Sequence, residues 1–307
     1  MIDHIKYYIP NKENFVETIE NSDKVDLRIC INSKTGEILD KRIAKFKNMI
    51  ITITKNRATL NGSIHKYYNI LEGYGEQNYN DFSYCDYRYA INHLQNSFNI
   101  DYNNTYITNL EFGLNIHIDQ DPQELIDNYI LMYDNKLPNR NDKFNGKGDY
   151  LEFKKTDYSL KIYNKSKQNK LKSENILRVE LKITGSRYLK SHFNIYSLID
   201  VDRQRYKLLF NKLLEHFDKL LLVDSLSLNA SDRIDEKMLF QNGINPYNWV
   251  NLKSKKSKRE LEKFKSDFFA LLKEYNLLKT KTDIVKLLKY KFNQLTNCDC
   301  ETLKNAA

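Results

Sequence analysis

The chain has 307 residues, of which 41% are hydrophobic, and its 49 Lys and Arg against 40 Asp and Glu give a formal net charge of +9. This length allows a sizeable buried core and two structural units, and the hydrophobic fraction excludes a wholly disordered chain. The positive balance favours a polyanionic partner such as nucleic acid. A basic protein without such a partner has the same composition, so charge leaves both alternatives open.

The four cysteines are Cys30, Cys85, Cys298 and Cys300. Only the last two are close in sequence, so their spacing predicts no zinc framework, and scattered cysteines favour a reducing cytoplasm. No run of about 20 apolar residues predicts a membrane span. Polar residues interrupt the N-terminal segment where a signal peptide has its apolar core. We therefore expect a cytoplasmic protein without membrane contact.

Alternation of apolar and polar residues predicts a β-meander in the first part of the chain. The expected strands cover residues 1–9, 25–32, 38–46, 49–54 and 57–68. In the last of these, Asn61, Ser63 and His65 share one face. A loop over residues 69–82 and an amphipathic helix over residues 86–98 follow.

Residues 108–118 form a strand with an unbroken apolar face, and Glu111 lies on its opposite, polar face. Asp121 and Pro122 suit the N-cap and first turn of a helix whose apolar stripe extends to Tyr133. Residues 134–149 are rich in Asn, Asp, Lys and Gly, which predicts an exposed loop.

Three further strands are expected at residues 150–155, 158–165 and 177–184. The first carries Glu152, whose position relative to Glu111 cannot be deduced from the sequence. The second and third have strict alternation, and their polar faces carry Ser159, Lys161, Tyr163 and Lys165, and Arg178, Glu180, Lys182 and Thr184.

Helical spacing dominates from Asp200 onward, with helices expected at residues 205–223, 253–275 and 282–295 and a loop at 242–249. The order of elements predicts an α+β fold, a central antiparallel sheet with helices packed on one face, over residues 1–200. Residues 201–307 form a C-terminal helical region. Its lysine-rich segment near residue 255 fits either a DNA-binding module or a bundle that braces the sheet.

Glu111, Glu180 and Tyr163 lie on one surface if their three strands share a sheet, and we expect this surface to be open. Two carboxylates suit a hard divalent cation such as Mg²⁺ or Mn²⁺, and a phenol flanked by Lys161 and Lys165 suits attack on a phosphate. Solvated strand residues paired with neighbouring lysines are the alternative for the glutamates.

Several segments resemble the rolling-circle replication initiators of filamentous phages and related plasmids, the gene II/gene X family. The most specific are residues 177–183 (LRVELKI) and 186–191 (SRYLKS), where the family has an Arg–hydrophobe–Glu strand before an Arg-Tyr-Leu-Lys segment. Residues 1–3, 61–67, 108–111 and 161–165 add weaker blocks in the family's order. The similarity covers roughly residues 1–200.

The resemblance implies that Tyr163 nicks one strand of origin DNA, single-stranded or supercoiled duplex, and stays joined to its 5′ end. Lys161 and Lys165 would assist, Glu111 and Glu180 would hold the metal, and a host polymerase would extend the 3′ end, with a host helicase as a further partner. The DNA contacts expected are His65, Lys66, Lys167, Arg178, Arg187, Lys190, Lys255 and Lys256. A non-catalytic DNA-binding regulator of replication is the alternative.

Two departures from the related nickases stand out. Their His–hydrophobe–His metal motif is reduced to His117-Ile118-Asp119, so no two-histidine metal site is expected. No second tyrosine is clearly placed near Tyr163, which leaves open whether a second nucleophile rejoins the strand.

Overall fold

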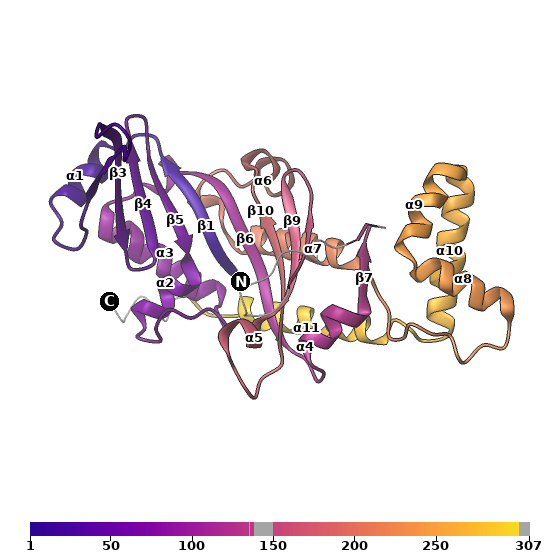
Figure 1. Cartoon of the computed structure of the whole chain (residues 1–307). Helices are drawn as coiled ribbons and strands as arrows, with labels where there is room; N and C mark the ends of the chain where they lie inside the picture. The colour runs from indigo at the N-terminus through magenta and orange to yellow at the C-terminus, as the bar shows by residue number, and fades with distance from the viewer. Residues whose placement is uncertain (135, 138–149, 301–307) are drawn as a thin grey trace.

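The computed structural model describes residues 1–134, 136–137 and 150–300, so the loop expected at 134–149 lies almost wholly outside the described residues. A nine-stranded antiparallel sheet forms its centre, in the order β2-β3-β4-β5-β1-β6-β10-β9-β8 (Figure 1). The predicted α+β class and antiparallel sheet are confirmed. The strands are β1 (Ile2–Ile9), β2 (Arg28–Ile31), β3 (Ile38–Phe46), β4 (Met49–Thr54), β5 (Ala58–Ser63), β6 (Tyr106–His117), β8 (Tyr150–Lys154), β9 (Tyr158–Asn164) and β10 (Ile176–Ile183).

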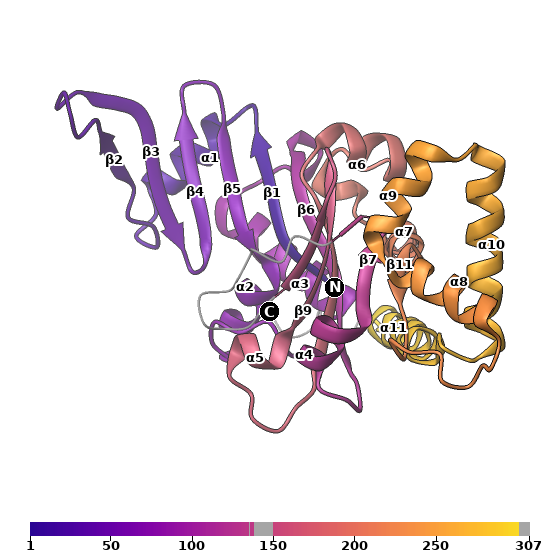
Figure 2. The ribbon, with the colours of Figure 1, turned by 45° about the vertical axis from the view of Figure 1, so that its right-hand side comes forward.

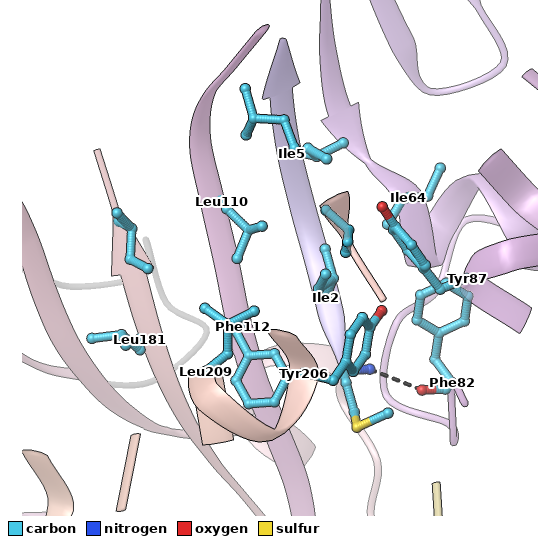
Figure 3. Packing of buried hydrophobic residues seen from close by; sticks show 14 of the residues in the cluster. Ile2, Ile5, Ile64, Phe82, Tyr87, Leu110, Phe112, Leu181, Tyr206 and Leu209 are labelled. Carbon is cyan, nitrogen blue, oxygen red and sulfur yellow. Dashed lines mark hydrogen bonds between the residues drawn. The ribbon is translucent and has the colours of Figure 1, made fainter. Parts of the chain in front are cut away.

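Three long helices cover one face of the sheet: α3 (Tyr84–Phe98), α7 (Arg203–Asp218) and α11 (Lys279–Thr296). Phe112 of β6 packs edge-on against Tyr206 of α7 with ring centroids 5.8 Å apart, and Tyr206 contacts Tyr87 of α3 (Figure 3). Phe292 of α11 stacks on Phe210 of α7 at 4.1 Å. The apolar sides of these strands and helices therefore form one continuous core.

Shorter helices and turns connect the strands and the three long helices. They are α1 (Glu13–Glu20), α2 (Ile64–Leu71), α4 (Pro122–Glu124), α5 (Lys165–Asn169), α6 (Ser186–Phe193), a π-helical turn (Leu125–Tyr129) and two 3₁₀ turns (Tyr102–Asn104 and Leu198–Asp200). Among the described residues, no helix has both the length and the apolar character needed to cross a bilayer.

The strand expected over residues 57–68 is wrong in its second half. β5 ends at Ser63, and α2 begins at Ile64 because the Ser63 hydroxyl accepts a hydrogen bond from the Lys66 amide and caps the helix. His65 therefore does not share a strand face with Asn61. An apolar-polar alternation of only a few residues cannot distinguish a strand from the first turn of a capped helix.

Two predicted helices are cut short by a small second sheet of β7 (Ile130–Tyr133) and β11 (Leu220–Leu222). The helix expected from Asp121 to Tyr133 ends at Tyr129, and the one expected over residues 205–223 ends at Asp218. Both apolar runs fit a helix or a buried strand by pattern alone, and the pairing that decides between them joins segments about 90 residues apart.

Three helices, α8 (Ile234–Ile244), α9 (Pro246–Lys255) and α10 (Lys258–Glu274), form a satellite beside β7 and β11, as Figure 2 shows. Its separate core centres on Trp249 and Phe268, and the Trp249 indole donates to the Gly243 carbonyl at 2.8 Å. The loop expected at 242–249 is instead the junction of α8 and α9, where Pro246 begins α9. The helix expected over 253–275 is interrupted at Ser257, which forms a capping box with Glu260.

Packing thus divides the helical region after residue 200 into two parts. α7 and α11 belong to the core of the sheet, whereas α8–α10 contribute mainly to the satellite core. The chain leaves the main body after Asp224 and rejoins it at Leu277, which lies next to Asp224. Its amide donates to the Leu277 carbonyl, and its carboxylate accepts from the amides of Lys279 and Thr280 at the start of α11.

Candidate active site

The register of β6, β10 and β9 brings the predicted site residues onto one face of the sheet. Arg178 of β10 lies opposite Tyr163 of β9, and the next position on this face, Glu180, lies opposite Lys161. On the other side of β10, Lys182 lies opposite Glu111 of β6. Directly paired residues of antiparallel strands point to the same side, so the expected common face of Glu111, Glu180 and Tyr163 is confirmed.

Arg178 is the centre of a buried polar network at one end of this face. Its guanidinium donates to the Glu180 carboxylate at 2.7 Å and to the Asn115 side-chain oxygen at 3.0 Å, and it lies 3.4 Å from the Asp3 carboxylate. Arg178 is only 2% exposed. The expectation that it contacts DNA is therefore wrong for this structure, because its charge is already used by two carboxylates.

Asp3 joins β1 to this network. Its carboxylate accepts hydrogen bonds from the Ser63 hydroxyl and, at 2.7 Å, from the Asn78 amide. Burial disfavours the charged form of Asp3, but Arg178, Lys165 and His65 outweigh burial and hold its pKa below the usual range. Asp3 is therefore a permanent counter-charge for Arg178.

Tyr163 and Lys165 lie at the same end and are also covered. Tyr163 is 5% exposed, and the Lys165 ammonium lies 5.6 Å from the centre of its ring. Burial and, to a lesser degree, Glu180 raise the pKa of Tyr163 well above its usual value, although Arg178 opposes them. Burial lowers the pKa of Lys165 to about 8, so this lysine can release a proton near neutral pH more readily than an exposed one.

The segment between α2 and α3, residues 72–83, helps to cover this end. The Asn78 side-chain oxygen accepts from the Lys165 ammonium at 2.8 Å, and the backbone carbonyls of Asn78 and Tyr79 accept from the Asn115 amide. The expectation that the face around Tyr163 is open is therefore wrong. Strand alternation tells which side chains share a face, but it does not tell which distant segment folds over them.

The opposite end of the face, around Glu111, is more accessible. The Glu111 carboxylate lies 3.1 Å from the Lys182 ammonium, and Lys182 is about one-third exposed. Burial and the charge of Glu180 raise the pKa of Glu111, while Lys161, His4 and Lys182 oppose them. Burial is the larger cause, so the raised pKa of Glu111 reflects mainly the loss of water around its carboxylate, and the neighbouring charge of Glu180 adds to it.

A bulge in β1 adds His4 to this end. Ile2 pairs with Phe112 and Ile5 pairs with Leu110, so two residues of β1, Asp3 and His4, stand opposite the single residue Glu111. The sequence did not indicate this, because strict alternation places Asp3 and His4 on opposite faces.

Glu111 and Glu180 fit a divalent cation by their chemistry and position. They are diagonal neighbours on adjacent strands, and both are carboxylates of the kind that Mg²⁺ and Mn²⁺ bind. Glu152 does not join this pair, because it lies on β8, two strands away from Glu180, where it is opposite Lys161 and accepts a hydrogen bond from the Ser159 hydroxyl. The ammoniums of Lys161 and Lys182 now lie near Glu180 and Glu111, and both side chains are partly exposed, so they can swing away.

The remaining predicted DNA contacts are dispersed. His65 is buried in α2, hydrogen-bonded to Asn80 and stacked on Phe82, so its expected contact with phosphate is wrong for this structure. Lys66 is half-buried on the same helix, and Lys167 is exposed on α5, directly after the Tyr163 strand.

Arg187 and Lys190 are exposed on α6, which follows Ile183 at the end of β10. Ile183 pairs with Tyr158, so α6 starts at the far end of β9 from Tyr163. Lys255 and Lys256 are exposed at the junction of α9 and α10 in the satellite. The structure therefore brings neither pair next to Tyr163.

Tyr150 is a candidate that sequence reasoning missed. It pairs directly with Tyr163 across the β8–β9 ladder, so a second phenol does lie on the same face beside the first. Tyr150 is half-buried and is thus less enclosed than Tyr163. The sequence could have indicated this through the β8–β9 hairpin. With a turn at residues 155–157, pairing the two strands outward from the turn places Tyr150 opposite Tyr163.

No protein-family model matches the chain, and no curated protein matches it. Among solved structures, the chain is similar to a rolling circle replication initiator protein from Geobacillus stearothermophilus, with 11% sequence identity and a TM-score of 0.41. The match covers 80% of this chain and 96% of that chain. An identity and a TM-score this low carry no argument about the chemistry of this chain.

Proposed function

We propose that this chain initiates rolling-circle DNA replication by nicking one strand at an origin, with Tyr163 as the nucleophile. The observation that carries the proposal is the cross-strand row of Tyr163 and Arg178, with Glu180 and Glu111 next to it on the same face. The sequence resemblance of residues 161–165 and 177–191 to the initiator family supports the same assignment. The net charge of +9 suits a DNA substrate.

In the proposed reaction, the phenol oxygen of Tyr163 forms a bond to phosphorus, and the bond from phosphorus to the 3′ oxygen breaks. The phenol proton passes to solvent or to neutral Lys165, and the leaving oxygen takes up a proton to become a 3′-hydroxyl. Lys161 and Lys165 lie on either side of Tyr163 in sequence and would neutralise phosphate oxygens. The product is a 5′-phosphotyrosyl link and a 3′ end that a host polymerase extends.

Glu111 and Glu180 would hold a divalent cation, which when bound polarises the phosphate and stabilises the leaving oxygen. Arg178 keeps Glu180 in place through the 2.7 Å hydrogen bond and fixes its orientation towards Lys161. Because Tyr163 is covered, the proposal also requires residues 72–83 to move before DNA reaches the phenol. The hydrogen bonds of Asn78 to Asp3 and Lys165, and those of the Asn115 amide to the Asn78 and Tyr79 carbonyls, are among the contacts that would break.

The test is a cleavage assay on the replication origin of the phage or plasmid that encodes this chain. The origin is supplied both as supercoiled duplex and as a single-stranded oligonucleotide, with Mg²⁺ or Mn²⁺. The expected product is a protein–DNA adduct that survives denaturation and carries the DNA through a 5′ phosphate on tyrosine. A free 3′-hydroxyl on the other fragment, extended by added polymerase, completes the expected result. Specific binding without any adduct contradicts the proposal.

A non-catalytic DNA-binding regulator is the second candidate, and the burial of Tyr163 together with its raised pKa favours it. Such a protein binds origin DNA and never becomes joined to it. The adduct assay therefore separates the two candidates.

A further inference from the structure

Three cysteines that are far apart in sequence meet at one point of the helical layer. Cys85 lies in the first turn of α3, and Cys298 and Cys300 follow the end of α11, more than 200 residues later. The three sulfur atoms all lie within 4.8 Å of one another. Among the residues that the structure describes, this is the only group of three or more His, Cys, Asp or Glu side chains close enough to share an ion.

A simple disulfide does not account for this arrangement. Cys85 is in contact with both Cys298 and Cys300, although one sulfur atom can form a disulfide with only one partner. A disulfide would therefore leave the third cysteine as an unused thiol beside the bond. One ion bound by all three sulfurs uses every member of the cluster at once.

The surroundings favour the thiolate form that a metal ion requires. The Arg203 guanidinium, at the start of α7, lies 3.4–3.8 Å from all three sulfurs and donates to the Cys298 carbonyl. The Cys85 amide points at the Cys298 sulfur at 3.1 Å, as first-turn amides do towards anions. A cation and a helix N-terminus both stabilise thiolates.

We propose that Cys85, Cys298 and Cys300 bind one Zn²⁺ ion through their thiolates. Thiolates of a tetrahedral zinc site lie about 2.3 Å from the ion and hence about 3.8 Å from each other, so the Cys85 sulfur must move apart from both of its partners to admit the ion. Binding releases the thiol protons to solvent. Three thiolates and Zn²⁺ leave one negative charge, which Arg203 balances, and the fourth position of the tetrahedron is left for water.

The site ties α11, the last helix of the core, to α3. α3 and α11 cover the same face of the sheet and contact each other directly, and the cysteine cluster adds a link between α3 and the residues that follow α11. Zinc there would stabilise the helical layer, on the face of the sheet opposite to Glu111 and Glu180. The inference is independent of the proposed nicking activity.

The test measures metal directly. Protein purified under reducing, oxygen-free conditions is titrated with Zn²⁺ and then, separately, with Co²⁺ as a spectroscopic probe, and bound metal is counted per chain. We expect one ion per chain and, with Co²⁺, the sulfur-to-metal charge-transfer and visible bands of tetrahedral thiolate coordination. A chelator should lower the melting temperature, and added Zn²⁺ should restore it.

Single replacements Cys85→Ser, Cys298→Ser and Cys300→Ser should each weaken zinc binding, whereas Cys30→Ser, on β2, should retain it. Cys298→Ser and Cys300→Ser alter the end of the chain, so they remain informative if Cys85→Ser fails to fold. If the reduced protein takes up no zinc, or if Cys30→Ser loses zinc as completely as the other variants, the proposal is wrong. A disulfide of Cys85 found by mass spectrometry, with no zinc uptake after its reduction, would also overturn it.

Discussion

Arg178 and Glu180 lie two positions apart on β10, and their side chains form an ion pair of 2.7 Å that is almost completely buried. Asp3 adds a second carboxylate 3.4 Å from the same guanidinium. Water cannot stabilise any of these charges, so each depends on the others. The network therefore joins β1, β6 and β10 at the place where the candidate active site is built.

Replacing Arg178 by Met should destabilise the protein by about 3–5 kcal/mol, because it leaves Glu180 and Asp3 as uncompensated buried charges. Urea denaturation measures this loss. The matched control is Arg28→Ala, which removes an exposed pair with Asp26 and should change the stability by less than about 1 kcal/mol. Equal effects of the two replacements would show that the buried network adds nothing to the fold.

Tyr163→Phe should abolish the protein–DNA adduct while origin binding is retained, since only the attacking oxygen is removed. Tyr150→Phe is the matched control, because it alters the directly paired phenol on the same face. Adduct formation is followed by denaturing gel electrophoresis with labelled DNA. If Tyr163→Phe still forms the adduct and Tyr150→Phe does not, Tyr150 is the nucleophile.

Glu111→Gln should reduce nicking by about 100-fold or more with little effect on DNA binding, because it removes one charged metal ligand and keeps its shape. Nicking should stop in chelator and return with added Mg²⁺. Glu180→Gln is expected to act in the same direction, but it also weakens the pair with Arg178, so its stability must be measured first. Undiminished cleavage in chelator would exclude the metal role of both glutamates.

Acid should destabilise the protein through His65. Burial, with the charges of the Met1 amine and Arg178, lowers the pKa of His65 to about 3, although Asp3 opposes them. Between about pH 6.5 and pH 3 the unfolded chain binds a proton that the folded chain does not, so stability falls as the pH falls, by up to about 1.4 kcal/mol per pH unit. His65→Gln should flatten this slope in urea titrations, whereas exposed His192→Gln should not. Identical slopes for both variants would contradict the assignment.

The exposed basic cluster of the satellite should set the salt dependence of DNA binding if it contacts phosphates. Its members are Lys253, Lys255, Lys256, Lys258 and Arg259. Alanine replacement of several should reduce the slope of log affinity against log salt by up to about one per lost contact. Cleavage of saturating single-stranded origin DNA should continue, since the candidate active site lies on the sheet. An unchanged slope would assign the satellite a structural role.

Alternation was sufficient to predict most of the sheet and the shared face of Glu111, Glu180 and Tyr163, because a strand has only two faces. It could not predict the bulge that sets His4 against Glu111, or the cover that Asn78 provides. Both depend on contacts between segments that are distant in sequence. The cysteines show the same limit, since the spacing that predicted no zinc framework hides the approach of Cys85 to Cys298.

The meeting of the two ends of the satellite at Asp224 makes α8–α10 an exchangeable cassette. Because the chain departs after Asp224 and returns at Leu277, which its amide contacts at 3.0 Å, a short linker could bridge the gap without moving α7 or α11. Truncating the chain after α10 would instead remove α11 from the main core. Met132, Leu221 and Val223 of the main body are buried in the satellite core, so a small domain grafted between these two positions would have to cover the same three side chains.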